Sequence, residues 1–199
     1  MAGICLDGVE GRGVRTLAVL LLLLPSSCAL FQPPAAILPP SWVELEAAHF
    51  GDLRNVSKCG DVWFGGGVTE EDVELAYRRG VQSILDLSFP EEEPDFDLRR
   101  ACADNGIALY DLDLLRAEVL SDRNANEALD LFRDTEHHPL LVVCGTASNG
   151  AAFFALWRAL DHEVPFDEAL EEARRAGMRP GPLETYVRAQ FERLSSEEG

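Results

Sequence analysis

Apolar runs alternate with amphipathic stretches between residues 59 and 195. Period-two and continuous apolar patterns predict strands, and apolar positions recurring every three to four residues predict helices. The strand patterns are 61–64, 83–87, 107–112 and 140–143, and the helical patterns are 69–79, a stretch ending near 105, 125–133, 150–160, 166–176 and 183–194. Strands that alternate with helices in this way require crossover connections. The sequence therefore predicts a single α/β domain with a mainly parallel central sheet flanked by helices.

Three local signals mark where these elements begin, end or bend. Thr69-Glu70-Glu71-Asp72 has the spacing of a helix N-terminal capping box, and Asn105-Gly106 predicts a left-handed residue at a helix C-terminus. The triple glycine at 65–67 lacks the Lys-Ser/Thr of a nucleotide-binding P-loop. We therefore expect these glycines to permit a tight turn.

The N-terminus has the layout of a targeting segment. Arg12 and Arg15 precede the apolar run 17–24, and Pro25 and small residues follow it. This is the pattern of a signal peptide, predicted over 1–29. A spanning helix needs about 20 apolar residues. The run is shorter than this and no stop-transfer segment follows, so we expect no integral membrane span once the leader is removed.

Residues 30–58 are expected to form a linker or transit segment, because the stretch 32–43 contains two Pro-Pro pairs and no acidic residue. The whole leader resembles the two-part leaders of algae with complex plastids, in which a signal peptide precedes an acid-poor stretch beginning near a Phe. That resemblance implies entry into the secretory pathway and delivery to a plastid. Plain secretion is the alternative. At the other end of the chain, residues 196–199 form a charged tail.

Composition narrows the class of partner. The 199 residues include 35 acidic and 17 basic side chains, for a formal charge of -18. Such a field repels nucleic-acid phosphates and anionic membrane surfaces, so no nucleic-acid partner is expected. A phosphorylated small molecule or protein remains a candidate, because a local nest of backbone N–H groups can bind phosphate within an unfavourable global field.

The cysteines do not indicate a metal site. They stand at 5, 28, 59, 102 and 144, with no CxxC pair and no close Cys/His cluster, so no metal and no cofactor are predicted. Removal of the leader would leave three cysteines, an odd number, and therefore at least one free thiol.

Cys144 lies where an α/β sheet places chemistry. It ends the apolar run 140–143 and is followed by the small or polar residues of a loop, and then by a helix. Successive N–H groups of such a loop, together with the positive end of the helix, bind oxyanions and lower a thiol pKa. We therefore assign Cys144 as the candidate nucleophile. The candidate anion-binding loop is Gly145, Thr146, Ala147, Ser148, Asn149 and Gly150.

A set of segments resembles, in order and spacing, the beta-lactamase-hydrolase-like phosphatase family of the cysteine-dependent protein tyrosine and dual-specificity phosphatases. These segments are Val62–Asp72, Gly80–Leu87, Gly106–Tyr110, Cys144–Arg158 and Ala169–Gly177. The resemblance implies a dual-specificity-phosphatase-like domain over 59–195. It also implies a cysteine that attacks phosphorus, a loop arginine that clamps the phosphoryl oxygens, and an Asp on a neighbouring loop that protonates the leaving group.

The sequence departs from this family at the arginine. Counted with four residues after the cysteine its position holds Asn149, and counted with five it holds Gly150. A neutral amide cannot supply the charge of a guanidinium in phosphoryl transfer. The residue before the cysteine, commonly His in these enzymes, is Val143.

The remaining site candidates lie at the end of the third predicted strand or soon after it. Asp113 is the candidate general acid, with Asp111 as the alternative, and Arg116 is a candidate substitute for the loop cation. Three functions therefore stay open. The first is a phosphate monoesterase using a Cys144 thiolate, the second a pseudophosphatase that binds an anionic or phosphorylated ligand or partner, and the third a rhodanese-like sulfurtransferase.

Overall fold

The computed structural model describes residues 43–112 and 122–197. The predicted signal peptide, residues 30–42 of the predicted linker or transit segment, and the candidates Asp113 and Arg116 lie outside these residues. Within them, no helix is long and apolar enough to cross a membrane. The same residues contain no cluster of three or more His, Cys, Asp or Glu side chains that could hold a metal ion.

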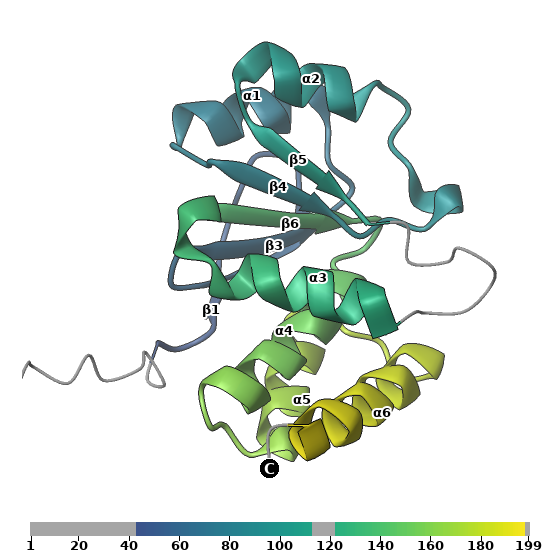
Figure 1. The fold of residues 1–199 in the computed structure, drawn as a ribbon. Coiled ribbons are helices and arrows are strands. Elements are labelled where there is room, and N and C mark those ends of the chain that lie inside the picture. Colours follow the sequence, from purple (N-terminus) through teal and green to yellow (C-terminus); the bar gives the residue numbers. More distant parts are fainter. Residues whose placement is uncertain (1–42, 113–121, 198–199) are drawn as a thin grey trace, which may run out of the picture. The chain divides into compact units, whose positions relative to one another are not determined.

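A mixed sheet forms the centre of the domain, with strand order β1-β2-β3-β6-β4-β5 (Figure 1). Strands β3, β6, β4 and β5 are parallel, whereas β1 and β2 join them as an antiparallel extension. The strand bounds are β1 Glu46–Ala47, β2 Arg54–Cys59, β3 Val62–Gly66, β4 Ser83–Asp86, β5 Ala108–Asp111 and β6 Leu140–Cys144. This arrangement confirms the predicted mainly parallel α/β sheet.

Helices cover both faces of the sheet. Helices α1 and α2 lie on one face, and α3, α4, α5 and α6 lie on the other (Figure 1). Their bounds are α1 Glu70–Arg78, α2 Leu98–Asn105, α3 Asp122–Arg133, α4 Ser148–Asp161, α5 Phe166–Arg175 and α6 Pro182–Glu197, with short 3₁₀ turns η1 Pro90–Glu92 and η2 Thr135–His137.

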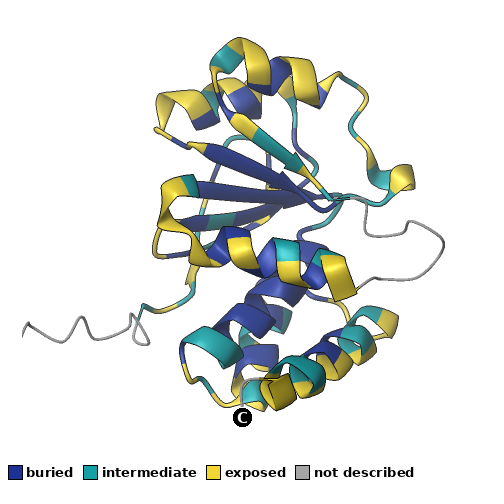
Figure 2. Ribbon diagram, in the orientation of Figure 1, coloured by how far each residue is buried: buried dark blue, intermediate teal, exposed yellow. Residues whose placement is uncertain are grey.

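Strand β6 shows why the sheet needs helices on both sides. All five of its residues are buried, and alternate side chains enter the two cores. Leu140, Val142 and Cys144 face the helices α3 to α6, and the intervening residues face α1 and α2. A strand buried on both faces reads as a continuous apolar run, as the sequence does here. In Figure 2 the central strands and α4 are accordingly the most deeply buried elements.

The predicted helix ends are confirmed. Thr69 accepts a hydrogen bond from the Asp72 backbone N–H while the Asp72 carboxylate accepts from the Thr69 backbone N–H, a reciprocal capping box. Gly106 ends α2 in the left-handed conformation, with φ of 70°.

The predicted domain start at residue 59 is too late. Strand β2 lies within the segment assigned to a linker, and it pairs with β3 across a two-residue turn. Phe50, Leu53 and Val56, which precede or belong to β2, are buried in the core. The segment was misjudged because β2 is largely polar and pairs with a register shift, so its period-two pattern is weak.

Candidate functional site

The position predicted for Cys144 is confirmed. It is the last residue of β6, at the carboxyl edge of the parallel strands, and α4 begins four residues later at Ser148. Backbone N–H groups of Thr146, Asn149 and Gly150 are directed at the Cys144 sulfur. The loop therefore forms the nest of inward N–H groups expected of an anion site at a strand-to-helix turn.

The glycines of β3 have a different role from the one predicted. Gly65 and Gly66 lie within the strand, and only Gly67 adopts a positive φ, of 71°. A Cβ added to Gly66 would come within 2.6 Å of the Thr146 backbone. The glycine therefore permits the close approach of β3 and the Cys144 loop.

The outer side of the loop is held by polar contacts from elsewhere in the chain. The Arg54 guanidinium donates to the Gly145 carbonyl at 2.9 Å, and the Asn55 amide donates to the Thr146 carbonyl at 3.1 Å. On the other flank, the Ser148 hydroxyl accepts from the Arg179 backbone N–H at 3.1 Å. The Gly145 and Thr146 carbonyls therefore accept hydrogen bonds on the outer side of the loop, and this orientation leaves backbone N–H groups of the loop facing inward.

The electrostatics of the thiol differ from the sequence prediction. Burial raises the pKa of Cys144, and the backbone N–H groups of Thr146, Asn149 and Gly150 only partly offset this rise. The side chain is 2% exposed, so the thiolate loses most of its hydration. The predicted lowering of the thiol pKa is therefore wrong for this loop, because desolvation outweighs the nest.

A carboxylate at the rim acts in the same direction. Glu92 of η1 also raises the Cys144 pKa, and its carboxyl group would lie 2.6 Å from a Cβ added to Gly145. The same carboxylate accepts a hydrogen bond from the Phe89 backbone N–H at 3.3 Å, which fixes it over the loop. A negative charge at this position disfavours both the thiolate and an anionic ligand in the loop.

The structure distinguishes the two positions counted for the missing arginine. At Gly150 an added Cβ would meet Val142 Cγ1 at 3.0 Å, so a side chain there points into the core. At Asn149 the side chain runs instead toward the end of β4, where its amide donates to the Leu87 carbonyl at 2.7 Å. Asn149 is 2% exposed. The Asn149 side chain thus joins the first turn of α4 to the end of β4 by a buried hydrogen bond.

Asp111 does not reach the thiol. Asp111 pairs in register with Asp86 of β4, so the two side chains are on the same face of the sheet. Asp86 is two residues from Ile84, and this face is therefore the one that α1 and α2 cover. Its carboxylate forms an exposed ion pair of 3.0 Å with Arg99 of α2. Cys144 faces α4 on the opposite side, so the alternative acid is not brought to the nucleophile.

Sequence reasoning missed Glu92, Asp86 and the Leu87 carbonyl. Asp86 is a buried carboxyl whose pKa is raised by desolvation and whose oxygen accepts from the Ser88 N–H at 2.9 Å. The strand pattern placed residue 86 at the same sheet edge as Cys144, which is a usable signal. Glu92 lay in an acidic stretch without a pattern, and only the fold brings it to the loop.

Comparison with known proteins gives structural neighbours only. No protein-family model and no curated protein sequence matches the chain. The core catalytic domain of the S. cerevisiae PP-IP phosphatase SIW14 superposes with a TM-score of 0.58 at 19% identity, covering 73% of this chain and 93% of that one. Tk-PTP in its active form gives 0.56 at 18% identity, covering 67% and 92%. PTPMT1 in complex with PI(5)P gives 0.57 at 14% identity, covering 69% and 94%.

These neighbours share the sheet-and-helix architecture of this chain. Their identities to this chain lie below 20%, so the similarity concerns the fold. Nearly the full length of each neighbour is covered, which leaves no large part of their fold missing here. The described domain therefore has the same fold as these phosphatase structures.

Proposed function

We propose that this protein is a pseudophosphatase, which binds the phosphoryl group of a phosphorylated small molecule or protein at the Cys144 loop without hydrolysing it. The observation that carries the proposal is the buried hydrogen bond of 2.7 Å from the Asn149 amide to the Leu87 carbonyl. This hydrogen bond engages, in the packing of the domain, the side chain at the position where the resembled phosphatase family has its phosphate-clamping arginine.

Three features oppose turnover. The raised pKa of Cys144 keeps the thiol protonated at neutral pH, so little nucleophile is present. Asn149 carries no charge to stabilise the transition state, where preorganised charges are worth several kcal/mol. Asp111 lies on the opposite face of the sheet and cannot protonate a leaving group at the thiol.

Binding has separate support. The N–H groups of Thr146, Asn149 and Gly150 converge on one point, and α4 directs its positive end there. Phosphorylated ligands are also the class named for the neighbours, a PP-IP phosphatase and a PI(5)P complex. Glu92 weakens anion binding at the rim, so we expect low affinity for free phosphate.

Turnover is tested with p-nitrophenyl phosphate under reducing conditions, comparing the wild-type chain with Cys144→Ser. We expect superimposable traces at the rate of the uncatalysed reaction. Phosphate release that disappears in Cys144→Ser would show an active enzyme and contradict the pseudophosphatase. Thiocyanate formation from thiosulfate and cyanide would instead identify a rhodanese-like sulfurtransferase.

Binding is tested by titrating inorganic phosphate while following the amide signals of the loop by NMR. We expect saturable shifts at Thr146, Asn149 and Gly150. Glu92→Gln removes a like charge from the rim and should tighten binding about fivefold, since an exposed charge contact is worth about 1 kcal/mol. Glu91→Gln, which removes the same charge from an exposed neighbour, is the matched control and should change little. Loop amides that do not respond to phosphate would refute the binding role.

A further inference from the structure

A cavity opens at the opposite edge of the sheet from Cys144. Its volume is about 490 Å³, within the range of small-molecule sites. Asp61 and Val62, at the start of β3, line it, and β6 begins beside it at Leu140. The length of β6, about 13 Å at about 3.3 Å per residue, therefore separates this cavity from the Cys144 loop.

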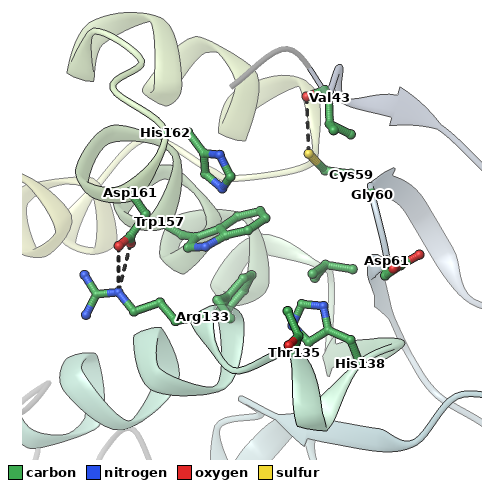
Figure 3. A pocket seen from close by; sticks show the side chains of 12 residues that line it. Val43, Cys59, Gly60, Asp61, Arg133, Thr135, His138, Trp157, Asp161 and His162 are labelled. Atoms are coloured by element: carbon green, nitrogen blue, oxygen red, sulfur yellow. Dashed lines mark hydrogen bonds and ion pairs between the residues drawn. The ribbon is translucent and has the colours of Figure 1, made fainter. Parts of the chain in front are cut away.

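The walls of the cavity are mainly apolar and aromatic. Val43, Val62, Phe132 and Trp157 surround it, and the rings of the last two lie 5.6 Å apart (Figure 3). The indole of Trp157 is packed against the rings of Phe132 and Phe154, and it also lines the cavity. Such walls bind the apolar body of a ligand by removing it from water.

One polar side chain in the lining lacks partners. His162 follows α4 and is 6% exposed, and both of its ring nitrogens are buried without a hydrogen-bond partner among the residues that the structure describes. Its ring meets Trp157 edge to face at 4.3 Å. An N–H over an indole face is a weak contact and can serve one nitrogen at most. At least one imidazole nitrogen is therefore left to be satisfied from the cavity.

The charge state of the site points to a neutral ligand. Burial, together with the positive charge of Arg158, lowers the pKa of His162, so the imidazole is neutral at pH 7. Arg158 is itself paired with Glu172 at 2.8 Å. At the cavity mouth Arg133 is paired with Asp161, also at 2.8 Å (Figure 3). The cations that could hold an anionic head group are already neutralised.

We propose that this cavity binds a neutral aromatic or aliphatic alcohol, with its apolar body between Val62, Phe132 and Trp157 and its hydroxyl on the imidazole of His162. A neutral imidazole has one donor and one acceptor nitrogen. A hydroxyl group both donates and accepts, so it matches whichever nitrogen faces the cavity in either tautomer. This site is independent of the function proposed for the Cys144 loop.

The probe for the test is 2-naphthol, with naphthalene as the matched ligand that lacks the hydroxyl. Titration is followed by the indole and imidazole NMR signals of Trp157 and His162. We expect saturable 2-naphthol binding with a Kd on the order of 0.1 mM, the strength reasonable for so few atoms. Absence of saturable shifts at these two residues would overturn the proposal.

The variant His162→Phe separates the hydrogen bond from the apolar wall. It should weaken 2-naphthol about tenfold, the worth of one buried hydrogen bond, and leave naphthalene binding unchanged. Circular dichroism melting checks that the variant folds, and we expect no loss of stability because the orphan nitrogens are gone. A 2-naphthol affinity that is the same in His162→Phe as in the wild-type chain would refute the role of His162.

Three further variants locate the site. Thr135 lines the cavity and is exposed, so Thr135→Trp should obstruct the mouth and abolish 2-naphthol binding without disturbing the core. Glu136→Trp adds the same ring at an exposed neighbour outside the lining and should bind as the wild type does. Cys144→Ser should also leave 2-naphthol binding intact, which distinguishes this proposal from the phosphate site. Binding unaffected by Thr135→Trp would place the ligand elsewhere and contradict the proposal.

Discussion

The two edges of the central sheet differ in how their polar groups are satisfied. At the carboxyl edge, the Asn149 amide, the Ser148 hydroxyl and the loop carbonyls all have partners within the chain. At the amino edge, the His162 nitrogens are buried without a partner among the described residues. At the edge that carries the cysteine motif, the side chains and loop carbonyls are thus paired, and only the N–H groups directed at Cys144 are left for an anion. At the other edge a buried side chain has unmet hydrogen-bonding capacity.

This difference shows that the place of a sequence motif and the place of unpaired polar side chains are separate properties of the fold. The Cys144 loop keeps its shape because it joins β6 to α4 and because Arg54, Asn55 and Asn149 hold it by hydrogen bonds. A buried, unpaired polar group instead costs free energy that a ligand can recover. The comparison can be tested with variants that loosen the first edge or complete the second.

The largest effect is expected at Gly66. A Cβ at 2.6 Å from the Thr146 backbone cannot be accommodated without moving the loop, so Gly66→Ala should lower the free energy of unfolding by about 3 kcal/mol. Urea denaturation measures the loss. Gly80→Ala is the control, because a Cβ there meets nothing within 4 Å and only its φ of 75° is unfavourable, at about 1 kcal/mol. Equal losses would mean that β3 and the loop are not in close contact.

A second effect concerns thiol reactivity. Because burial raises the pKa of Cys144, the thiol is protonated at neutral pH, and its alkylation rate should still be rising with pH above pH 7 as the thiolate fraction grows. Cys59, whose pKa is raised to about 11 by burial at the opposite edge, should show the same rise. Iodoacetamide pulses with mass spectrometry give both rates. A Cys144 rate that levels off below pH 7 would reveal a stabilised thiolate and an active-site environment after all.

A smaller change in the free energy of unfolding is expected for a substitution at Asn149. It should be opposite in sign to the change expected at His162. Asn149→Leu leaves the Leu87 carbonyl unpaired in the interior, which should destabilise the fold by about 2 kcal/mol. Asn126→Leu makes the same change at an exposed site of α3 and should stay within about 0.5 kcal/mol. Thermal and urea melts compare these with His162→Phe, for which stabilisation is expected. Destabilisation of similar size at 149 and 162 would erase the contrast between the edges.

The strand-helix alternation and the place of Cys144 could be predicted from local sequence. Apolar periodicity and capping residues depend on local conformation. The structure has the predicted strand at 140–143 and the predicted helix cap at Thr69. Strand β2 was missed because its pattern is weak, although the Gly60-Asp61 pair between it and β3 is a hairpin signal. Gly60 adopts the positive φ that such a turn requires, at 58°.

The electrostatics of the site could not be predicted in the same way. The pKa of Cys144 depends on how much water reaches the sulfur and on Glu92, 52 positions earlier in the chain. The Asn149 contact joins residues 62 positions apart. Such long-range terms arise from the packed fold, so a sequence motif gives the location of the thiol but not its reactivity.

The hairpin of β2 and β3 has a consequence for how the chain tolerates shortening. A polypeptide beginning at Cys59 would lack β2, and β3 would become the outermost strand with its backbone N–H and C=O groups unpaired on one side. Val62 and Phe64, which are fully buried, lie on that strand. Open apolar edges recruit other chains by strand addition. The polar and irregular strand that sequence patterns overlook is therefore what shields the sheet from self-association.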